Sequence, residues 1–273
     1  MNEGGGAAPG FRVVPFDCLD STNEEARRLA ADGAEAGPVV WARRQRSGRG
    51  RRGRAWVSDE GNLFCSVIVR PVCPPGEAAQ VSLVTALAVA ETVEDALGGT
   101  GAAPLAPAPR VTVQVKWPND VLAGGRKLAG ILLESDGGHG GGGVSLVVGV
   151  GINIAHAPEG TEFPATSLAR EGAAALTVPA VLDVFLARFG SWYRRWSAEG
   201  LAPVRAAWLA RAAGLGGPVT VRLHAETLWG SFIGLDGDGA LLLDPGSGAP
   251  VRRIAAGDVF FPVSPASLVR PCS

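Results

Sequence analysis

The residues best suited to chemistry form one basic segment, residues 43–56, which we name the arginine loop. Each guanidinium stays charged and needs a partner or water, so such a segment cannot bury itself. Its glycines allow positive φ angles and let backbone N–H groups approach a ligand. We predict a mobile loop that orders around a multiply charged anion such as a phosphate chain. The arginines are Arg43, Arg44, Arg46, Arg49, Arg51, Arg52 and Arg54, and the glycines are Gly48, Gly50 and Gly53.

The arginine loop could also be a solvated charge run or a nucleic-acid patch. Trp56 and the apolar segment 62–70 follow the loop, so core residues bracket it. The whole chain has a net charge of −1 and a pI of about 6.3, so the rest of it offsets the loop. A nucleic-acid binder usually spreads its basic charge along a face. Charge gathered at one point favours a phosphate-binding loop.

A lysine stands where an apolar strand ends. In the segment 114–121, Lys116 closes the strand, and Pro118 holds Trp117 extended and stops the ladder. The chain then turns at Asn119-Asp120. Such a position directs the ammonium toward a site. The alternative is a surface lysine whose stem packs on Trp117.

Glycines interrupt two later strands. Gly130 lies in the segment 126–134. Gly149 and Gly151 lie in the segment 148–153. A glycine weakens a strand unless a ligand or another backbone approaches closely there. Beside a strand-end lysine and the arginine loop, a slot walled by glycines suits a flat organic ligand joined to a nucleotide phosphate, although a bulge or a packing accommodation would also account for such glycines.

Periodicity and turn signals place the regular elements of the first two hundred residues. Ser21 and Glu24 have capping-box spacing, which predicts a helix that runs to Gly33. Apolar and aromatic residues recur at helical spacing over 178–196, which is typical of a core face rather than of a cofactor box. We predict strands at 11–16, 39–42, 62–70, 111–117, 127–134 and 144–154, helices at 21–33, 77–97 and 178–196, a linker at 99–109 and a Gly-rich bridge at 137–143.

From Pro218 the sequence changes to short alternating runs separated by turn signals. Five short strands over about 45 residues predict a small β-barrel of SH3-like size. The domain boundary is predicted at 214–217, and residues 1–10 are predicted to be a disordered tail. The strands are predicted at 219–223, 227–235, 240–243, 250–254 and 259–262.

The composition limits the environment and the kind of site. No apolar run reaches the roughly 18–20 residues that a membrane span needs, and the N-terminus lacks a secretory signal. The four cysteines show no metal-ligand spacing, and with only three histidines a dedicated zinc site is not expected. We therefore expect a cytoplasmic protein with reduced thiols and no membrane partner.

Several segments together resemble the signature segments of biotin protein ligases. The segments are Gly48-Arg-Gly-Arg-Arg-Gly-Arg-Ala-Trp56, Lys116-Trp-Pro-Asn-Asp120, Arg126-Lys-Leu-Ala-Gly-Ile-Leu-Leu-Glu134 and Gly149-Val-Gly-Ile-Asn153, and Ser21-Thr-Asn23 resembles the family's early biotin-contact motif. The resemblance covers residues 11–170 by motif. It implies an α+β fold in which a mixed β-sheet is flanked by helices, related to lipoate ligases and class II tRNA synthetases. A catalytic domain at 11–214 would precede an SH3-like β-barrel at 217–264.

The resemblance implies an ATP-dependent enzyme. Biotin and ATP would give biotinyl-5′-AMP and pyrophosphate, and Mg²⁺ would be held mainly by phosphates and water. Biotin would then pass to a lysine in the biotin carboxyl carrier domain of a biotin-dependent carboxylase, such as an acyl-CoA or pyruvate carboxylase. Some members also carry an N-terminal DNA-binding domain. Only twenty residues precede Ser21, so we expect no repressor function and no DNA partner.

The resemblance also implies site residues. Lys116 would cancel the repulsion between the biotin carboxylate and the α-phosphate, with Arg49 and Arg51 as catalytic partners. Biotin would contact Ser21, Thr22, Asn23, Gln45, Arg49, Gly50, Arg51 and Lys116 in a slot lined by Gly130, Gly149 and Gly151. ATP would contact Arg51, Arg52, Arg54, Trp56 and Asn153. Ser21 or Thr22 could instead simply cap the helix, and no residue is singled out as a ligand for Mg²⁺.

Two further functions are compatible with parts of the sequence. A lipoate or octanoate ligase on the same fold would want a longer apolar channel, and its signature segments differ from the arginine loop and Lys116–Asp120. A nucleic-acid-binding module would use the arginine loop and the barrel, and its binding would depend on salt.

Overall fold

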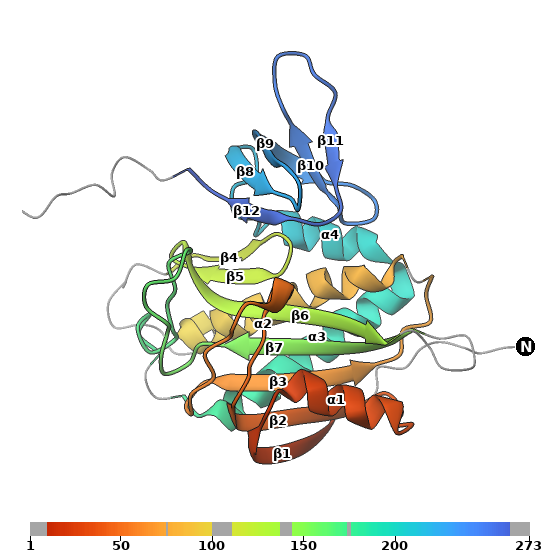
Figure 1. The fold of residues 1–273 in the computed structure, drawn as a ribbon, viewed down its shortest axis with the longest axis vertical. Coiled ribbons are helices and arrows are strands. Elements are labelled where there is room, and N and C mark those ends of the chain that lie inside the picture. The colour runs from red at the N-terminus through yellow and green to blue at the C-terminus, as the bar shows by residue number, and fades with distance from the viewer. Residues whose placement is uncertain (1–9, 75, 100–110, 137–143, 174–175, 263–273) are drawn as a thin grey trace, which may run out of the picture.

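The computed structural model describes residues 10–74, 76–99, 111–136, 144–173 and 176–262. A larger α+β unit carries a small all-β unit at one edge (Figure 1). Three of the predicted segments fall outside the described residues, apart from Gly10 and Gly99: the tail at 1–10, the linker at 99–109 and the bridge at 137–143.

Seven strands form one mixed sheet in the order β1-β2-β3-β7-β6-β5-β4, as predicted for the fold class. β1 and β2 are parallel, and the other neighbouring pairs are antiparallel. Every residue of β3 is buried, because helices cover both faces of the sheet, and its sequence is apolar except for Ser66. The strands are β1 Arg12–Leu19, β2 Pro38–Gln45, β3 Leu63–Val69, β4 Val113–Lys116, β5 Asp120–Ala123, β6 Arg126–Asp136 and β7 Ser145–Ile152.

Helix α1 (Thr22–Ala31) lies on one face of the sheet, and α2 (Val81–Glu94) and α3 (Val178–Glu199) lie on the other (Figure 1). A 3₁₀ turn at Ala78–Gln80 precedes α2, and a π turn at Asp95–Gly99 follows it. The aromatic stripe of α3 is buried core, as predicted, with rings of successive turns 5.6–5.8 Å apart from Phe185 to Trp196. No helix in the described ranges is long and apolar enough to cross a membrane.

The small unit is a five-stranded antiparallel sheet in the order β11-β10-β9-β8-β12 and forms the SH3-like barrel. It packs on the larger unit through α4 (Leu201–Leu209), where the Trp208 and Phe232 rings lie 6.4 Å apart. The Trp117 indole N–H also donates to the Gly239 carbonyl oxygen at 3.2 Å. The strands are β8 Pro218–Arg222, β9 Thr227–Leu235, β10 Leu241–Asp244, β11 Arg252–Ile254 and β12 Asp258–Phe260.

The structure differs from the sequence predictions at two elements. Helix α4 was not predicted, although its proline lies in the first turn, where a missing N–H costs little. Strand β4 does end at Lys116, but the turn that follows lies at 117–119, with a cis Trp117–Pro118 peptide. Asp120 is therefore the first residue of β5 rather than part of the turn. This hairpin brings the strand-end lysine and Asp120 opposite each other.

Candidate active site

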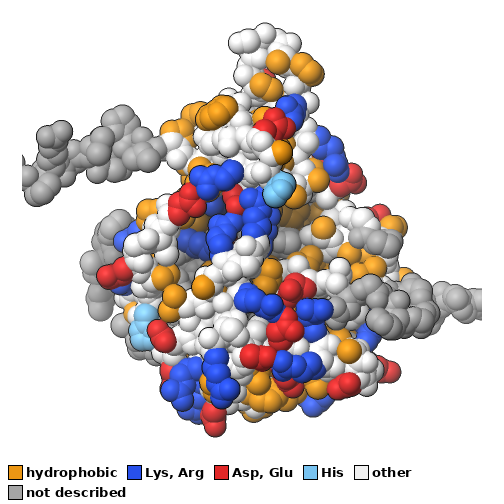
Figure 2. All heavy atoms as spheres, in the orientation of Figure 1, with side chains coloured by type: hydrophobic (Ala, Val, Ile, Leu, Met, Phe, Trp, Pro, Cys, Tyr) orange, Lys and Arg blue, Asp and Glu red, His pale blue; other side chains and the backbone are white. Residues whose placement is uncertain are grey.

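A pocket of about 420 Å³ lies between the arginine loop, the start of α1, the ends of the central strands and β12 of the barrel. Lysine and arginine side chains gather on the surface below the barrel in Figure 2. The pocket lining includes all but one of the site residues that were predicted from the sequence. They are Ser21, Thr22, Asn23, Gln45, Arg49, Gly50, Arg51, Arg54, Trp56, Lys116, Gly130, Gly149, Gly151 and Asn153.

Arg52, which was predicted to contact ATP, does not line the pocket. It adopts a positive φ of 56° in the 3₁₀ turn Arg51–Gly53, and its guanidinium contacts Asp258 at 3.2 Å instead. Arg51 and Arg54 contact the same carboxylate, but unlike Arg52 they also line the pocket.

A hydrogen-bond chain fixes the polar end of the pocket. The Thr22 backbone N–H and hydroxyl both donate to Gln45 Oε1, at 2.8 and 3.1 Å. Gln45 Nε2 in turn donates to the Ser58 hydroxyl at 2.9 Å. The predicted capping box is wrong, since Ser21 occupies the N-cap position but its side chain makes no capping bond. Gln45 meets the helix N-terminus in its place, which ties β2 to α1 at the pocket.

Two residues behind the pocket hold Asn23, and sequence reasoning did not nominate either of them. The Ser66 hydroxyl donates to Asn23 Oδ1 at 2.5 Å. The Asn23 amide donates to Glu134 Oε2 at 2.7 Å. Asn23 and Ser66 are both buried, so the Asn23 amide is held in one orientation.

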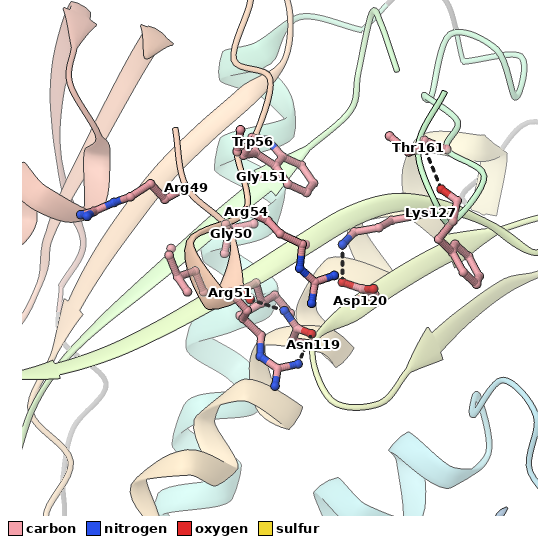
Figure 3. A pocket seen from close by; sticks show the side chains of 18 of the residues that line it. Arg49, Gly50, Arg51, Arg54, Trp56, Asn119, Asp120, Lys127, Gly151 and Thr161 are labelled. Atoms are coloured by element: carbon pink, nitrogen blue, oxygen red, sulfur yellow. Dashed lines mark hydrogen bonds and ion pairs between the residues drawn. The ribbon is translucent and has the colours of Figure 1, made fainter. Parts of the chain in front are cut away.

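The glycines of the central strands make room for side chains. A Cβ on Gly149 would lie 2.1 Å from Asn23 Oδ1. A Cβ on Gly151 would lie 2.6 Å from the Trp56 indole, and one on Gly130 would lie 2.8 Å from it. Trp56 therefore lies flat against the wall formed by Gly130 and Gly151, as Figure 3 shows beside Gly151. The contact between Trp56 and the nucleotide stays a prediction; the structure places the Trp56 ring on the glycine wall.

Replacing Gly151 with alanine is expected to displace the Trp56 indole and to lower the free energy of unfolding by about 1–3 kcal/mol, because the new methyl group overpacks the wall. Urea denaturation checks this value. Gly237→Ala is the matched control, because its Cβ would meet nothing within 4 Å. Equal unfolding free energies for the two variants would contradict the close contact.

Two lysines flank one buried carboxylate. Asp120 lies 2.6 Å from the Lys127 ammonium and 3.4 Å from that of Lys116 (Figure 3 shows the first contact). Burial alone would raise the pKa of Asp120, but Lys127 and Lys116 outweigh it and hold the pKa below its usual value. Burial lowers the pKa of Lys116, and Asp120 opposes that shift. These three side chains together contribute two positive charges and one negative charge to the pocket.

The two lysines occupy different parts of the pocket. Lys116 has 8% of its side chain exposed and packs over the Phe163 ring, 4.3 Å from its centroid. Lys127 is 27% exposed and lies 5.4 Å from the Trp56 ring. A Cβ on Gly130 would lie 3.4 Å from Lys127 Cε. Lys127 is therefore the lysine beside the glycine wall.

Sequence reasoning missed Lys127 for a physical reason. Strict alternation along β6 would put Lys127 and Gly130 on opposite faces of the sheet. The register between β5 and β6 shifts, so that Val121 pairs with Ala129 while Leu122 pairs with Lys127. This irregularity puts Lys127 and Gly130 on the same side. The amino-acid sequence of β6 gives no sign of this irregular register.

The arginines of the loop point in two directions. Arg49 pairs with Glu24 of α1, and in Figure 3 its side chain extends away from Lys127. Arg51 points toward the hairpin formed by β4 and β5 and donates to Asn119 Oδ1 at 3.2 Å. Burial lowers the pKa of Arg51. Arg51 therefore lies at the turn between β4 and β5, whereas the guanidinium of Arg49 lies at α1.

Asn153 lies in the wall but has a structural partner. It is buried, and its amide donates to the Thr166 carbonyl oxygen at 3.0 Å. The role in reading an adenine edge stays a prediction, and binding would have to leave or share that bond.

The described residues do not form a dedicated site for Mg²⁺. Among them, no group of three His, Cys, Asp or Glu residues is placed to hold a metal ion. The three carboxylates that line the pocket, Asp120, Glu162 and Asp258, each contact lysine or arginine side chains. Such partners compete with a cation for the carboxylate oxygens.

Comparison with known proteins agrees with this arrangement. Residues 16–153 match the biotin/lipoate A/B protein ligase family, and residues 214–261 match the biotin protein ligase C-terminal domain. A biotin–[acetyl-CoA-carboxylase] ligase of Paracoccus denitrificans is 42% identical, over 89% of this chain and 97% of that protein. A bifunctional ligase/repressor BirA of Bacillus subtilis is 32% identical, over 92% of this chain and 74% of that protein.

A solved structure shows the same fold. A biotin protein ligase from Aquifex aeolicus in complex with biotin and ATP superposes with a TM-score of 0.72 and 27% identity. The match covers 91% of this chain and 97% of that one. Together with the sequence matches, this agreement shows that the chain belongs to the biotin protein ligase family.

Proposed function

We propose that this ligase joins biotin to ATP and then passes biotin to a lysine of a biotin carboxyl carrier domain. A biotin carboxylate oxygen attacks the α-phosphorus, the bond to the β-phosphate oxygen breaks, and biotinyl-5′-AMP and pyrophosphate form. The acceptor amine then attacks the activated carbonyl, loses a proton and releases AMP. The convergence of Lys116, Lys127 and Arg51 on one glycine-walled pocket is the observation that carries the proposal.

The first step is limited by repulsion between two anions. Two unit charges 4 Å apart interact by about 4 kcal/mol at an effective dielectric of 20. Lys127 lies beside the glycine wall where biotin would bind, and Arg51 contacts Asn119 in the turn that follows Lys116. With Lys116 they offer a fixed positive field to the charge that develops between carboxylate and phosphate. No side-chain nucleophile is required.

The polar end of the pocket suits the ureido ring of biotin. The chain of Thr22, Gln45 and Ser58 presents oriented donors and acceptors there, and Asn23 is held by its partners behind the wall. Trp56 would move or share the slot when the ring system enters, because it now covers the glycine wall. The triphosphate would lie nearer Arg51 and Arg54, which line the side of the pocket close to the barrel.

The acceptor would be the carrier domain of a biotin-dependent carboxylase, in line with the name of the Paracoccus relative. Mg²⁺ would be held by the phosphates and water. The catalytic domain would span 11–214 and the barrel 217–264. A cytoplasmic location and the absence of DNA binding and repressor function stay predictions, and a gel-shift assay tests the last two.

Biotin-dependent exchange of labelled pyrophosphate into ATP tests the reaction. We expect exchange with biotin and at least tenfold less with lipoate or octanoate, since the pocket of about 420 Å³ ends in a polar hydrogen-bond chain rather than a long apolar channel. Transfer to a purified carrier domain tests the second step by mass spectrometry. Faster exchange with lipoate than with biotin would overturn the assignment of substrate.

Replacing Asp120 with asparagine is expected to move the alkaline limit of adenylate formation to lower pH. The Asp120 carboxylate opposes the burial that lowers the Lys116 pKa, so its loss lowers that pKa further. The ammonium form is then lost earlier as the pH rises. Single-turnover rates across the pH range check this, and an unchanged alkaline limb in a folded variant would contradict it.

A further inference from the structure

Three arginines of the arginine loop converge on one carboxylate of the barrel. Arg51 contacts Asp258 Oδ1 at 3.4 Å, Arg52 contacts Oδ2 at 3.2 Å, and Arg54 pairs with the same Oδ2. Arg51 also donates to the carbonyl oxygen of Gly257 at 3.2 Å. The arginine loop is thus tied to the first residue of β12, more than two hundred residues further along the chain.

Asp258 is placed to compete with a ligand. Its side chain is only 13% exposed and lines the pocket, as do Arg51 and Arg54. A carboxylate surrounded by guanidinium groups offers the same kind of charge-assisted hydrogen bonds as a phosphate oxygen. The arginines that we propose for the triphosphate are therefore already engaged by an anion of the protein itself.

When ATP binds, its phosphates are expected to replace Asp258 as the partner of the loop arginines. A triphosphate carries more charge and more acceptor oxygens than one carboxylate, so it is the stronger partner for these arginines. It also repels the Asp258 carboxylate at short range. Breaking the contacts between Asp258 and the loop consequently reduces the net free energy of ATP binding.

We propose that Asp258 is a positioning residue, a carboxylate latch that holds the arginine loop against the barrel until the phosphates of ATP take its place. The inference rests on the proposed role of Arg51 and Arg54 at the phosphates. The latch keeps the loop ordered in the ligand-free enzyme and weakens nucleotide binding by competition. It forms again when AMP and pyrophosphate have left.

Asp258→Asn tests the latch, since it removes the charge and keeps the shape. Trypsin is expected to cut the arginine loop of the ligand-free variant about 3–10 times faster than that of the wild type. The dissociation constants of ATP and pyrophosphate, measured by calorimetry, are expected to fall about 3–10-fold, because a competing charge at short range is gone. The dissociation constant of biotin alone should stay within twofold, and Asp258→Glu should restore wild-type behaviour.

Two further variants separate the latch from a general effect of charge. Arg52→Gln removes one latch contact from a side chain outside the pocket lining, and trypsin should cut after the remaining arginines of the loop faster than in the wild type, by a smaller factor than in Asp258→Asn. Asp238→Asn is the matched control on the barrel, because Asp238 is exposed and pairs only with Arg253 among the ion pairs of the described residues. The control should behave as wild type.

Weaker or unchanged binding of ATP and pyrophosphate by Asp258→Asn would overturn the latch, as would unchanged proteolysis of the loop in both Asp258→Asn and Arg52→Gln. Wild-type exchange of pyrophosphate is measured alongside. If the wild type shows no biotin-dependent exchange, the proposed function fails. If wild-type exchange is present and the variants show no effect, the latch alone fails.

Discussion

Lys116→Ala and Lys127→Ala are each expected to slow the formation of biotinyl-5′-AMP about 100–1,000-fold. Each lysine contributes a positive charge to a poorly hydrated pocket, where the removal of one fixed donor from a developing anion typically costs this much. Rapid-quench single-turnover assays with biotin and ATP measure the rate. Binding of biotin should weaken less than the rate falls, because the charge matters most in the transition state.

Neither lysine variant is expected to unfold the protein through an unpaired Asp120 carboxylate. In each variant the Asp120 carboxylate keeps one ammonium partner, at 2.6 or 3.4 Å, so the buried charge is not left alone. Arg170→Ala is a control for the loss of one positive charge, since this exposed residue pairs with Glu159 outside the pocket. Normal rates in both lysine variants would remove these residues from the proposed mechanism.

Arg51→Gly is expected to release the adenylate about 10–100 times faster. Arg51 lines the pocket and is one of the arginines that we propose for the phosphates, and a hydrogen bond from a charged group is worth about 1.5–3 kcal/mol. An escaped acyl adenylate reacts with any exposed amine. The variant should therefore biotinylate bystander lysines, which mass spectrometry of an added unrelated protein detects.

Arg46→Gly is the matched control for Arg51→Gly. Arg46 lies in the same loop, is exposed and does not line the pocket, so its loss should leave selectivity for the carrier domain unchanged. If Arg51→Gly and Arg46→Gly release adenylate equally slowly, retention does not depend on Arg51.

The mixed sheet and the barrel could be predicted because their signals are local. Strand β3 is an apolar run between turn signals, and α3 carries its aromatic stripe at helical spacing. The strand-end position of Lys116 was predicted for the same reason, since Pro118 interrupts the ladder. Elements without a distinct pattern, such as α4 and the short β5, were missed.

The rest of the site depends on contacts between distant segments. The irregular register of β6 that brings Lys127 to the glycine wall is set by pairing with β5. Ser66 reaches Asn23 only because β3 passes beneath α1. Asp258 meets the arginine loop through the packing of the barrel, so no spacing in the sequence indicates it. Such residues become visible only when the fold is known.

A crystal structure with biotin and a non-hydrolysable ATP analogue tests the central claim most directly. We expect the biotin carboxylate and the α-phosphate to lie within about 4 Å of each other, with the ammonium of Lys127 or Lys116 in hydrogen-bond contact with both. A complex in which both ammonium groups stay on Asp120 and touch neither reactant would contradict it.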